Sequence, residues 1–406
     1  MHILFLTDNF PPEVNAPASR TYEHCIEWVK EGCEVTVVTC FPNFPNGKVF
    51  SGYKNKLWDI ENMNGIRVIR VWTFITPNKG FLKRIIDYQS FMVSAVIASV
   101  FVKKPDVVIG TSPQFFTACA AYIVSFFKRK PFIFELRDIW PESIKVVGAM
   151  KDSFILNLLE KVEMHLYKKA DLIVSVTNSF KRVLMGRGVD GNKIRVVLNG
   201  ADLSNYKPMQ KDEEISSRYG LEGRFVAGYV GTHGMAHALE TILEAASKSE
   251  NRDIRFLMVG DGAQKDHLKE IAAMRNLDNV VFIDTVPKSD IARYYSLLDA
   301  SIIHLKKTDL FRTVIPSKLF ECMAMGIPVI FGVEGESAEI VISEDVGLTF
   351  EPENPDDLSR QINRLKDNEI LRKELRNKCV HASKKYRRDA NASEMLGHIL
   401  EVAGKG

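Results

Sequence analysis

Several features that mark other protein classes are missing from this chain of 406 residues. Its six cysteines are scattered, without Cys-x-x-Cys or metal-ligand spacing, which predicts buried thiols in a reducing cytoplasm and excludes a disulfide framework. The formal net charge of +3 is too small to indicate nucleic-acid binding. No basic leader opens the sequence, so we expect a cytoplasmic protein.

A membrane-spanning segment is also missing. The apolar run 91–102 has twelve residues, whereas a helix needs about 20 to cross a bilayer. The run fits either a buried helix or a helix that also rests on a membrane surface. The second interpretation draws on the lysines and arginine around it: Lys79, Lys83, Arg84, Lys103 and Lys104.

What is present is an alternation of strands and helices that runs twice along the chain. Strands are expected at residues 3–7, 34–39, 67–72, 106–111, 132–136, 172–177 and 195–198, then at 225–230, 255–259, 280–283, 300–305, 329–331 and 347–350. Apolar strands separated by helices predict parallel sheets covered on both faces. The turn-rich stretch 199–208 separates the two series. We therefore predict an α/β protein with two doubly wound, Rossmann-like domains and a ligand cleft between them.

Ligands in such sheets sit beyond the carboxyl ends of the strands. After the first strand comes Asn9-Phe10-Pro11-Pro12-Glu13 instead of Gly-x-Gly-x-x-Gly, which argues against a nicotinamide enzyme. The sequence has neither an Asp-x-Asp pair after a strand nor a His/Cys cluster, so nothing in it indicates a metal site.

The segment from Pro316 to Ile330 is the most informative part of the sequence. Pro316 and Ser317 suit a helix start, and Gly326 suits its end. Lys318 and Glu321 share one face of the first turn. Together with the free backbone N–H groups of that turn they predict a cradle for a phosphorylated ligand, although a surface ion pair would also explain them.

Two glycine turns follow strands of the second series. Gly231-Thr232-His233-Gly234 would let the backbone approach a ligand, and His233 could donate to a phosphate or a sugar hydroxyl. Gly260-Asp261-Gly262 is assigned to shaping the cleft, because a carboxylate repels phosphate. Both also fit plain tight turns.

In the first series, a strand end delivers Glu135, Arg137, Asp138 and Trp140 within six positions. Carboxylates for hydroxyl groups and an aromatic surface for ring faces are typical of sugar sites. The alternative is an internal salt bridge plus an aromatic plug.

Taken together, these residues resemble the family 4 retaining glycosyltransferases of GT-B fold. The resemblance covers essentially the whole chain and rests on the Phe10-Pro11-Pro12-Glu13 loop, Asn199-Gly200-Ala201-Asp202, Gly260-Asp261-Gly262, the segment 280–299 and the Lys318-to-Pro328 motif. Two further stretches, Asp138-Ile139-Trp140-Pro141-Glu142-Ser143 and Gly231-Thr232-His233-Gly234-Met235-Ala236-His237, resemble a branch that includes N-acetyl-L-fucosamine transferases of bacterial O-antigen and capsule assembly.

The chain departs from the family pattern in three places. Asn15-Ala16 replaces the usual Gly-Gly pair of the first loop. Thr232 and His237 replace an Arg and a Lys, and Thr313 stands where the first of two glutamates is usual. We infer that Lys318 and Arg312 supply the missing donor-phosphate cations.

The resemblance implies a domain at 1–200, completed by a C-terminal helix at about 386–406, that binds the acceptor, and a domain at 201–385 that binds the nucleotide sugar. It implies a retaining, metal-independent transferase without a cofactor. The expected donor is UDP-linked N-acetyl-L-fucosamine or a related N-acetylated sugar. The expected acceptor is a sugar on undecaprenyl diphosphate at the inner membrane face, in lipopolysaccharide or capsule biosynthesis.

Residue roles follow from the same resemblance. The expected catalytic residues are Asp138, Glu135 and Arg137. The expected donor-binding residues are Gly231, Thr232, His233, Arg312, Pro316, Ser317, Lys318 and Glu321, with Asn15 and Gly260 in the cleft loops. Backbone groups at 283–286 would meet the base. A GT-B nucleotide-sugar epimerase, a non-catalytic nucleotide-sugar-binding subunit and a soluble transferase with a small acceptor remain alternatives.

Overall fold

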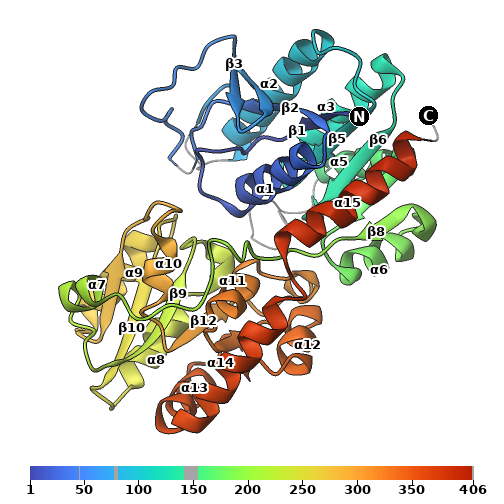
Figure 1. Ribbon diagram of the computed structural model, residues 1–406. Coiled ribbons are helices and arrows are strands. Elements are labelled where there is room, and N and C mark those ends of the chain that lie inside the picture. Colours follow the sequence, from blue (N-terminus) through green and yellow to red (C-terminus); the bar gives the residue numbers. More distant parts are fainter. Residues whose placement is uncertain (45, 77–80, 141–153, 405–406) are drawn as a thin grey trace. The chain divides into compact units, whose positions relative to one another are not determined.

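The computed structural model describes residues 1–44, 46–76, 81–140 and 154–404. The chain forms two compact units, one of Met1–Leu198 with Arg388–Gly406 and one of Asn199–Arg387 (Figure 1). We call them the N-terminal and the C-terminal unit and treat each by itself.

The N-terminal unit is built on an eight-stranded sheet in the order β3-β4-β2-β1-β5-β6-β7-β8. All neighbours are parallel except the hairpin β3–β4. The strands are β1 (His2–Leu6), β2 (Glu34–Cys40), β3 (Trp58–Met63), β4 (Ile66–Val71), β5 (Val107–Thr111), β6 (Phe132–Leu136), β7 (Leu172–Ser175) and β8 (Ile194–Val196). Strand β3 was not predicted, because this edge strand is mostly solvent-exposed and carries no buried apolar run.

Helices cover this sheet. They are α1 (Ala16–Lys30), α2 (Phe81–Val100), α3 (Phe115–Lys128), α5 (Phe154–Lys169), α6 (Asn178–Gly186) and the last helix, α15 (Arg388–Ala403). Although α15 follows the C-terminal unit in sequence, it packs on α1, where the Trp28 indole N–H donates to the Ala392 carbonyl at 2.9 Å. Met395, Leu396 and Ile399 of α15 join the core of the N-terminal unit.

The C-terminal unit has a six-stranded parallel sheet in the order β11-β10-β9-β12-β13-β14. Its strands are β9 (Phe225–Val230), β10 (Ile254–Val259), β11 (Val280–Ile283), β12 (Ala300–His304), β13 (Val329–Gly332) and β14 (Gly347–Thr349). Its helices are α7 (Glu213–Arg218), α8 (Glu240–Lys248), α9 (Lys265–Met274), α10 (Ile291–Tyr295), α11 (Lys318–Met325), α12 (Glu336–Ser343), α13 (Pro355–Asp367) and α14 (Glu369–Ser383). Both sheets agree with the predicted doubly wound architecture.

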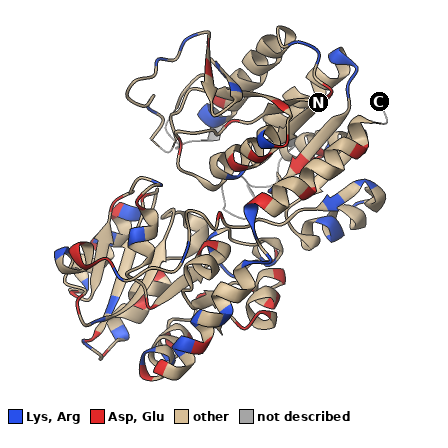
Figure 2. Cartoon of the chain, viewed as in Figure 1, with Lys and Arg blue, Asp and Glu red and all other residues tan. Residues whose placement is uncertain are grey.

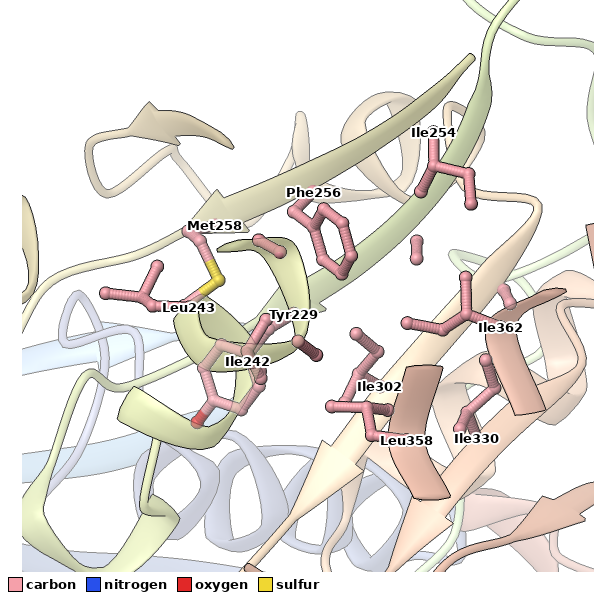
Figure 3. Close-up of a cluster of buried hydrophobic side chains, with 14 of the residues drawn as sticks. Tyr229, Ile242, Leu243, Ile254, Phe256, Met258, Ile302, Ile330, Leu358 and Ile362 are labelled. Carbon is pink, nitrogen blue, oxygen red and sulfur yellow. The ribbon is translucent and has the colours of Figure 1, made fainter. Parts of the chain in front are cut away.

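The core of the C-terminal unit lies between its sheet and the helices α8 and α13. Figure 3 shows Ile242 and Leu243 of α8, Leu358 and Ile362 of α13 and Phe256 and Met258 of β10 converging on this cluster. Tyr229 of β9 belongs to the same cluster and is fully buried. It therefore provides a rigid aromatic surface one residue before β9 ends.

Acidic and basic side chains are intermixed along α13 and α14 (Figure 2). Among the described residues, no helix combines the length and the apolar character that crossing a bilayer would require.

Candidate functional site

Three neighbouring strands of the C-terminal unit end in loops that hold one another through backbone hydrogen bonds. The N–H of Gly231 after β9 donates to the Val259 carbonyl at 2.9 Å, and the N–H of Gly260 after β10 donates to the Ile283 carbonyl at 3.0 Å. The N–H of His233 donates to the Asp261 carbonyl at 2.8 Å. These bonds fix the expected donor loops at the carboxyl edge of the sheet.

Only glycine fits at two of these positions. A Cβ on Gly260 would lie 2.0 Å from the Gly231 carbonyl oxygen, and one on Gly231 would lie 2.8 Å from the Lys318 Nζ atom. Both residues also have positive φ angles, +136° and +142°, which other residues rarely adopt. Gly260 therefore permits the β10 loop to lie against the β9 loop, and Gly231 permits the Lys318 ammonium to lie against the β9 loop.

The Lys318 side chain is the central feature of this edge. Lys318 is the first residue of α11, and its Nζ atom lies 3.7 Å from the centre of the Tyr229 ring. Within the described part of the chain, this buried nitrogen has no hydrogen-bond partner. Burial lowers the pKa of Lys318 to about 8. A buried cation that the protein leaves unpaired is costly, so the geometry suits an anion supplied by a ligand.

The other expected residues of the β9 loop differ in their exposure to solvent. Thr232 is exposed, and its carbonyl accepts the Tyr229 hydroxyl at 2.8 Å. The His233 ring is fully buried, and both its nitrogens lack partners among the described residues. Burial, assisted by the charges of Lys265 and Lys318, lowers the pKa of His233 to about 4, so the ring is neutral at pH 7. The pKa of His237 falls to about 3, again mainly through burial.

The start of α11 is partly open to solvent. Pro316, Ser317 and Lys318 are half-buried, and Ser317 precedes the first helical residue without capping the helix through its side chain. One turn along, Glu321 accepts a hydrogen bond from the Tyr295 hydroxyl at 3.0 Å. Lys318 and Glu321 thus share the predicted face but make no surface ion pair with each other, since their nearest partners are the Tyr229 ring and Tyr295.

Arg312 is placed differently from Lys318. Its guanidinium is more than half exposed and lies 3.8 Å from Asp309 and 3.9 Å from Glu334. Gly335 passes close to its backbone, because a Cβ on Gly335 would lie 2.1 Å from the Arg312 carbonyl oxygen. The Arg312 side chain is therefore exposed to solvent and only weakly paired with two carboxylates. Its expected contact with a donor phosphate stays a prediction.

In the N-terminal unit, Glu135 at the end of β6 is 1% exposed and accepts from the Arg20 Nε atom at 2.8 Å. Burial raises the pKa of Glu135, but the charges of Arg20 and Arg137 outweigh it and leave the pKa below its usual value. This is the internal salt bridge that the sequence left open. The second carboxylate oxygen of Glu135 is buried and has no hydrogen-bond partner among the described residues, and the expected catalytic role of Glu135 stays a prediction.

Arg137 and Asp138 lie just beyond the buried strand. Their backbone N–H groups donate to the Ser112 hydroxyl at 2.8 and 3.1 Å, and the Arg137 guanidinium donates to the Pro17 carbonyl at 3.1 Å. Burial lowers the pKa of Arg137 to about 9. Arg137 and Asp138 are both half-buried, and the expected contact of Asp138 with a sugar stays a prediction.

Trp140 is buried and stacks on Phe115, with ring centres 4.8 Å apart and planes at 10°. It is the aromatic plug of the alternative interpretation. Asn15 caps α1 by accepting from the Ala18 N–H at 2.8 Å, so its side chain has a structural partner. Pro141, Glu142, Ser143 and Lys79, which the sequence analysis also named, lie outside the described residues.

Sequence reasoning did not find Arg20, Tyr229, Tyr295 or Lys265. Lys265 is buried, and its Nζ atom donates to the Gly260 carbonyl and to Asp284, both at 2.6 Å. A lysine in the first turn of a helix carries no sequence signal for such burial. Within the ranges that the structure describes, no group of three or more His, Cys, Asp or Glu side chains could hold a metal ion.

The paired parallel sheets define a protein of the GT-B class, and solved structures share the fold. Sucrose-phosphate synthase from Thermosynechococcus elongatus matches with a TM-score of 0.80 at 15% identity, over 100% of both chains. Anabaena HepE, solved in complex with UDP-glucose, matches with a TM-score of 0.74 at 16% identity, over 99% of this chain and 100% of its own.

Residues 18–205 match the family model described as Glycosyltransferase Family 4, and residues 211–386 match Glycosyl transferases group 1. The putative colanic acid biosynthesis glycosyl transferase WcaI of Escherichia coli (strain K12) is 23% identical, over 80% of this chain and 82% of its own length. The probable glycosyltransferase WbjE of Pseudomonas aeruginosa is also 23% identical, over 68% and 70%. The chain belongs to the family 4 glycosyltransferases.

Proposed function

We propose that this glycosyltransferase moves an N-acetylated sugar from a UDP-sugar to a lipid-linked acceptor in bacterial surface polysaccharide biosynthesis, without a metal and with retention at the anomeric carbon. The unpaired Lys318 ammonium at the start of α11 carries the proposal. Two comparisons support it: relatives named for colanic and teichuronic acid biosynthesis, and a structural neighbour solved with UDP-glucose.

The chemistry follows from where charge develops. Breaking the bond between the anomeric carbon and the diphosphate oxygen leaves negative charge on the diphosphate. Lys318, the backbone N–H groups at the start of α11 and the Thr232 N–H would stabilise that charge, whereas the N–H groups of Gly231 and His233 already donate to other loops of the sheet edge. Because Lys318 is fixed over Tyr229, little reorganisation is needed when the charge appears.

The remaining donor contacts extend along the same edge. Glu321, held by Tyr295, would accept hydrogen bonds from the ribose hydroxyls. Backbone groups at 283–286, next to the end of β11, would meet the uracil base. Arg312 and Ser317 would contribute further phosphate contacts.

The N-terminal unit would bind the acceptor. Asp138 would hold the acceptor hydroxyl or the donor sugar, and the buried Arg20–Glu135 pair together with Arg137 would keep the β6 end in place. N-acetyl-L-fucosamine is the donor sugar that we favour, on the resemblance of the 138–143 and 231–237 stretches to that branch.

A thermal-shift comparison of UDP, GDP and dTDP tests the donor base. UDP should raise the melting temperature of the wild-type protein most, since a ligand that binds only the folded state stabilises it. The Lys318→Met variant should respond much more weakly to UDP, because only the uridine part of the ligand keeps its contacts. A wild-type protein that GDP or dTDP stabilises more than UDP would contradict the uridine assignment.

A turnover assay then separates transferase from epimerase and binding subunit. Donor and an undecaprenyl-diphosphate-linked acceptor should give product with retained configuration, and donor alone should stay unchanged. Epimerised sugar from donor alone, or donor binding without any turnover, would overturn the proposal.

A further inference from the structure

An apolar surface on the N-terminal unit is unlike the rest of the molecule. All the Phe and Trp side chains that rank among the exposed large hydrophobics of the described residues lie between Trp58 and Phe127. Phe127 is 72% exposed, Phe101 69% and Phe126 69%. Exposed aromatics concentrated in one segment usually mark an interaction site.

Helix α2 contributes a continuous stripe to this surface. Its exposed large apolar residues, Ile86, Val93, Ile97 and Val100, recur at helical spacing and share one face. A solvent-facing stripe is normally polar. Helix α2 departs from this rule. Phe91 and Ala95 on one side are buried in the unit, and the opposite, solvent-facing side is also apolar.

Direct contacts join the aromatic residues to the end of this stripe. The rings of Trp58 on β3 and Phe101 after α2 have centres 5.6 Å apart. Lys128 at the end of α3 donates to the carbonyls of Val100 and Val102 at 3.3 and 2.8 Å, which places Phe126 and Phe127 near the same end of α2. We define the apolar face as Val93, Ile97, Val100, Phe101, Trp58, Phe126 and Phe127.

Most charges around the apolar face are basic, and the acidic Asp59 and Glu61 near Trp58 on β3 are paired with Lys56 and Arg70. Between residues 81 and 104 the only acidic residue is Asp87, and between 115 and 131 there is none. Lys103, Lys104 and Arg129 are exposed at the end of α2 and after α3. Figure 2 accordingly shows α2 largely tan. Apolar side chains rimmed by cations match a surface that is apolar inside and anionic outside.

We propose that the apolar face docks on the surface of a lipid bilayer containing anionic lipids, with its aromatic and aliphatic side chains at the headgroup boundary and its lysines and arginine on lipid phosphates. The inference deepens the proposed function, because a lipid-linked acceptor is delivered from a bilayer. It also combines the two interpretations of the 91–102 run, since one side of α2 is buried in the unit and the other side is exposed.

Vesicle sedimentation with the full chain tests the proposal. The wild-type protein should bind vesicles of phosphatidylglycerol and phosphatidylethanolamine, and a Phe101→Ser/Phe126→Ser/Phe127→Ser variant should lose at least about tenfold in partitioning. Lys103→Glu/Lys104→Glu should weaken binding to these vesicles but not the weaker binding to pure phosphatidylcholine. A matched control, Met274→Ser/Ile342→Ser/Ile370→Ser, removes equally exposed apolar side chains from the C-terminal unit and should bind as the wild type does.

Two outcomes would overturn the docking surface. One is equal vesicle binding by the aromatic variant and the matched control, with circular dichroism showing both folded. The other is absent wild-type binding together with a dimer in sedimentation that the aromatic variant dissociates, which would assign the face to a second copy of the chain. Vesicle binding needs no nucleotide, so a failed UDP response with intact vesicle binding would count against the proposed transfer alone.

Discussion

Arg20 in the N-terminal unit and Lys318 in the C-terminal unit are both buried cations near the carboxyl edge of a parallel sheet, but their partners differ. Arg20 lies 2.8 Å from Glu135 and also donates to the carbonyls of Leu198 and Val197. Lys318 has an aromatic ring below it and, among the described residues, no hydrogen-bond partner for its Nζ atom. The first cation is neutralised by the fold, and the second is left for a ligand.

Lys265 sharpens the contrast because it belongs to the same edge as Lys318. It is also buried, yet its ammonium donates to the carbonyls of Gly260 and Ile283 and to Asp284. Burial alone therefore does not distinguish a binding lysine from a structural one in this sheet. The distinguishing property is whether the protein itself provides the hydrogen-bond acceptors.

The largest expected effect comes from breaking the satisfied pair. Arg20→Met leaves the Glu135 carboxylate buried without its cation, which should destabilise the N-terminal unit by about 3–5 kcal/mol. Denaturant unfolding followed by tryptophan fluorescence measures this loss. Lys318→Met should leave stability unchanged or raise it, because it removes a buried charge that has no partner; equal destabilisation by both variants would break the comparison.

Removing the unsatisfied cation should instead slow turnover. Without Lys318, the charge that develops on the leaving diphosphate loses its principal stabiliser, so kcat should fall by about 10²- to 10³-fold in Lys318→Met. A donor-turnover assay with a fixed acceptor measures it. Lys269→Met, on the exposed side of α9, serves as a control for simple loss of positive charge and should retain full activity.

The close approach of Gly231 to Lys318 predicts an intermediate effect. In Gly231→Ala the new Cβ would start 2.8 Å from Nζ, at a φ angle of +142°, so the ammonium must move from its place over Tyr229. Turnover should fall by about 10- to 100-fold. Gly234→Ala in the same loop is the matched control, since its nearest neighbour would be 3.6 Å away and its φ angle is −105°. Similar losses in both variants would show that the loop, and not Lys318, is responsible.

The lowered pKa of Lys318 gives a pH test of the same cation. The donor-free pKa is about 8, and a bound anion favours the charged form, so UDP binding should take up a proton above pH 8. The dissociation constant for UDP should be flat between pH 6.5 and 8, as an order-of-magnitude expectation, and then rise by up to about tenfold per pH unit. Calorimetry in buffers of different ionisation enthalpy measures the proton uptake, which Lys318→Met should eliminate.

The same group contributes to folding with the opposite trend. Its pKa in the folded protein lies below the usual lysine value of 10.5, so the burial penalty is fully present below about pH 8 and is relieved as the pH rises toward 10.5. Stability of the nucleotide-free wild type relative to Lys318→Met should therefore increase over this window. A constant difference would mean that Lys318 titrates normally.

Strand–helix alternation and the glycine and proline punctuation were enough to predict both sheets and the helix that starts at Lys318, because these are local signals. The edge strand β3 was missed, since exposed side chains leave no apolar pattern. The Arg20–Glu135 pair joins residues 115 positions apart, and the Tyr229 platform becomes meaningful only when α11 is placed against β9. The sequence thus did not reveal which charged side chains pair with residues far away in the chain. Those pairs decide which charged residues remain free to bind a ligand.

The smallest expected effect concerns Glu321. It is intermediate between Arg20 and Lys318, because the protein supplies a hydrogen bond to only one of its two carboxylate oxygens. The Tyr295 hydroxyl donates to one carboxylate oxygen at 3.0 Å, orienting the group that we assign to the ribose. Tyr295→Phe removes this single hydrogen bond and should weaken UDP binding by about 1 kcal/mol, roughly fivefold. Uridine, which keeps the ribose but lacks the phosphates, should lose the same factor in this variant and almost nothing in Lys318→Met. If both nucleoside and nucleotide were insensitive to Tyr295→Phe, the assignment of Glu321 to the ribose would be wrong.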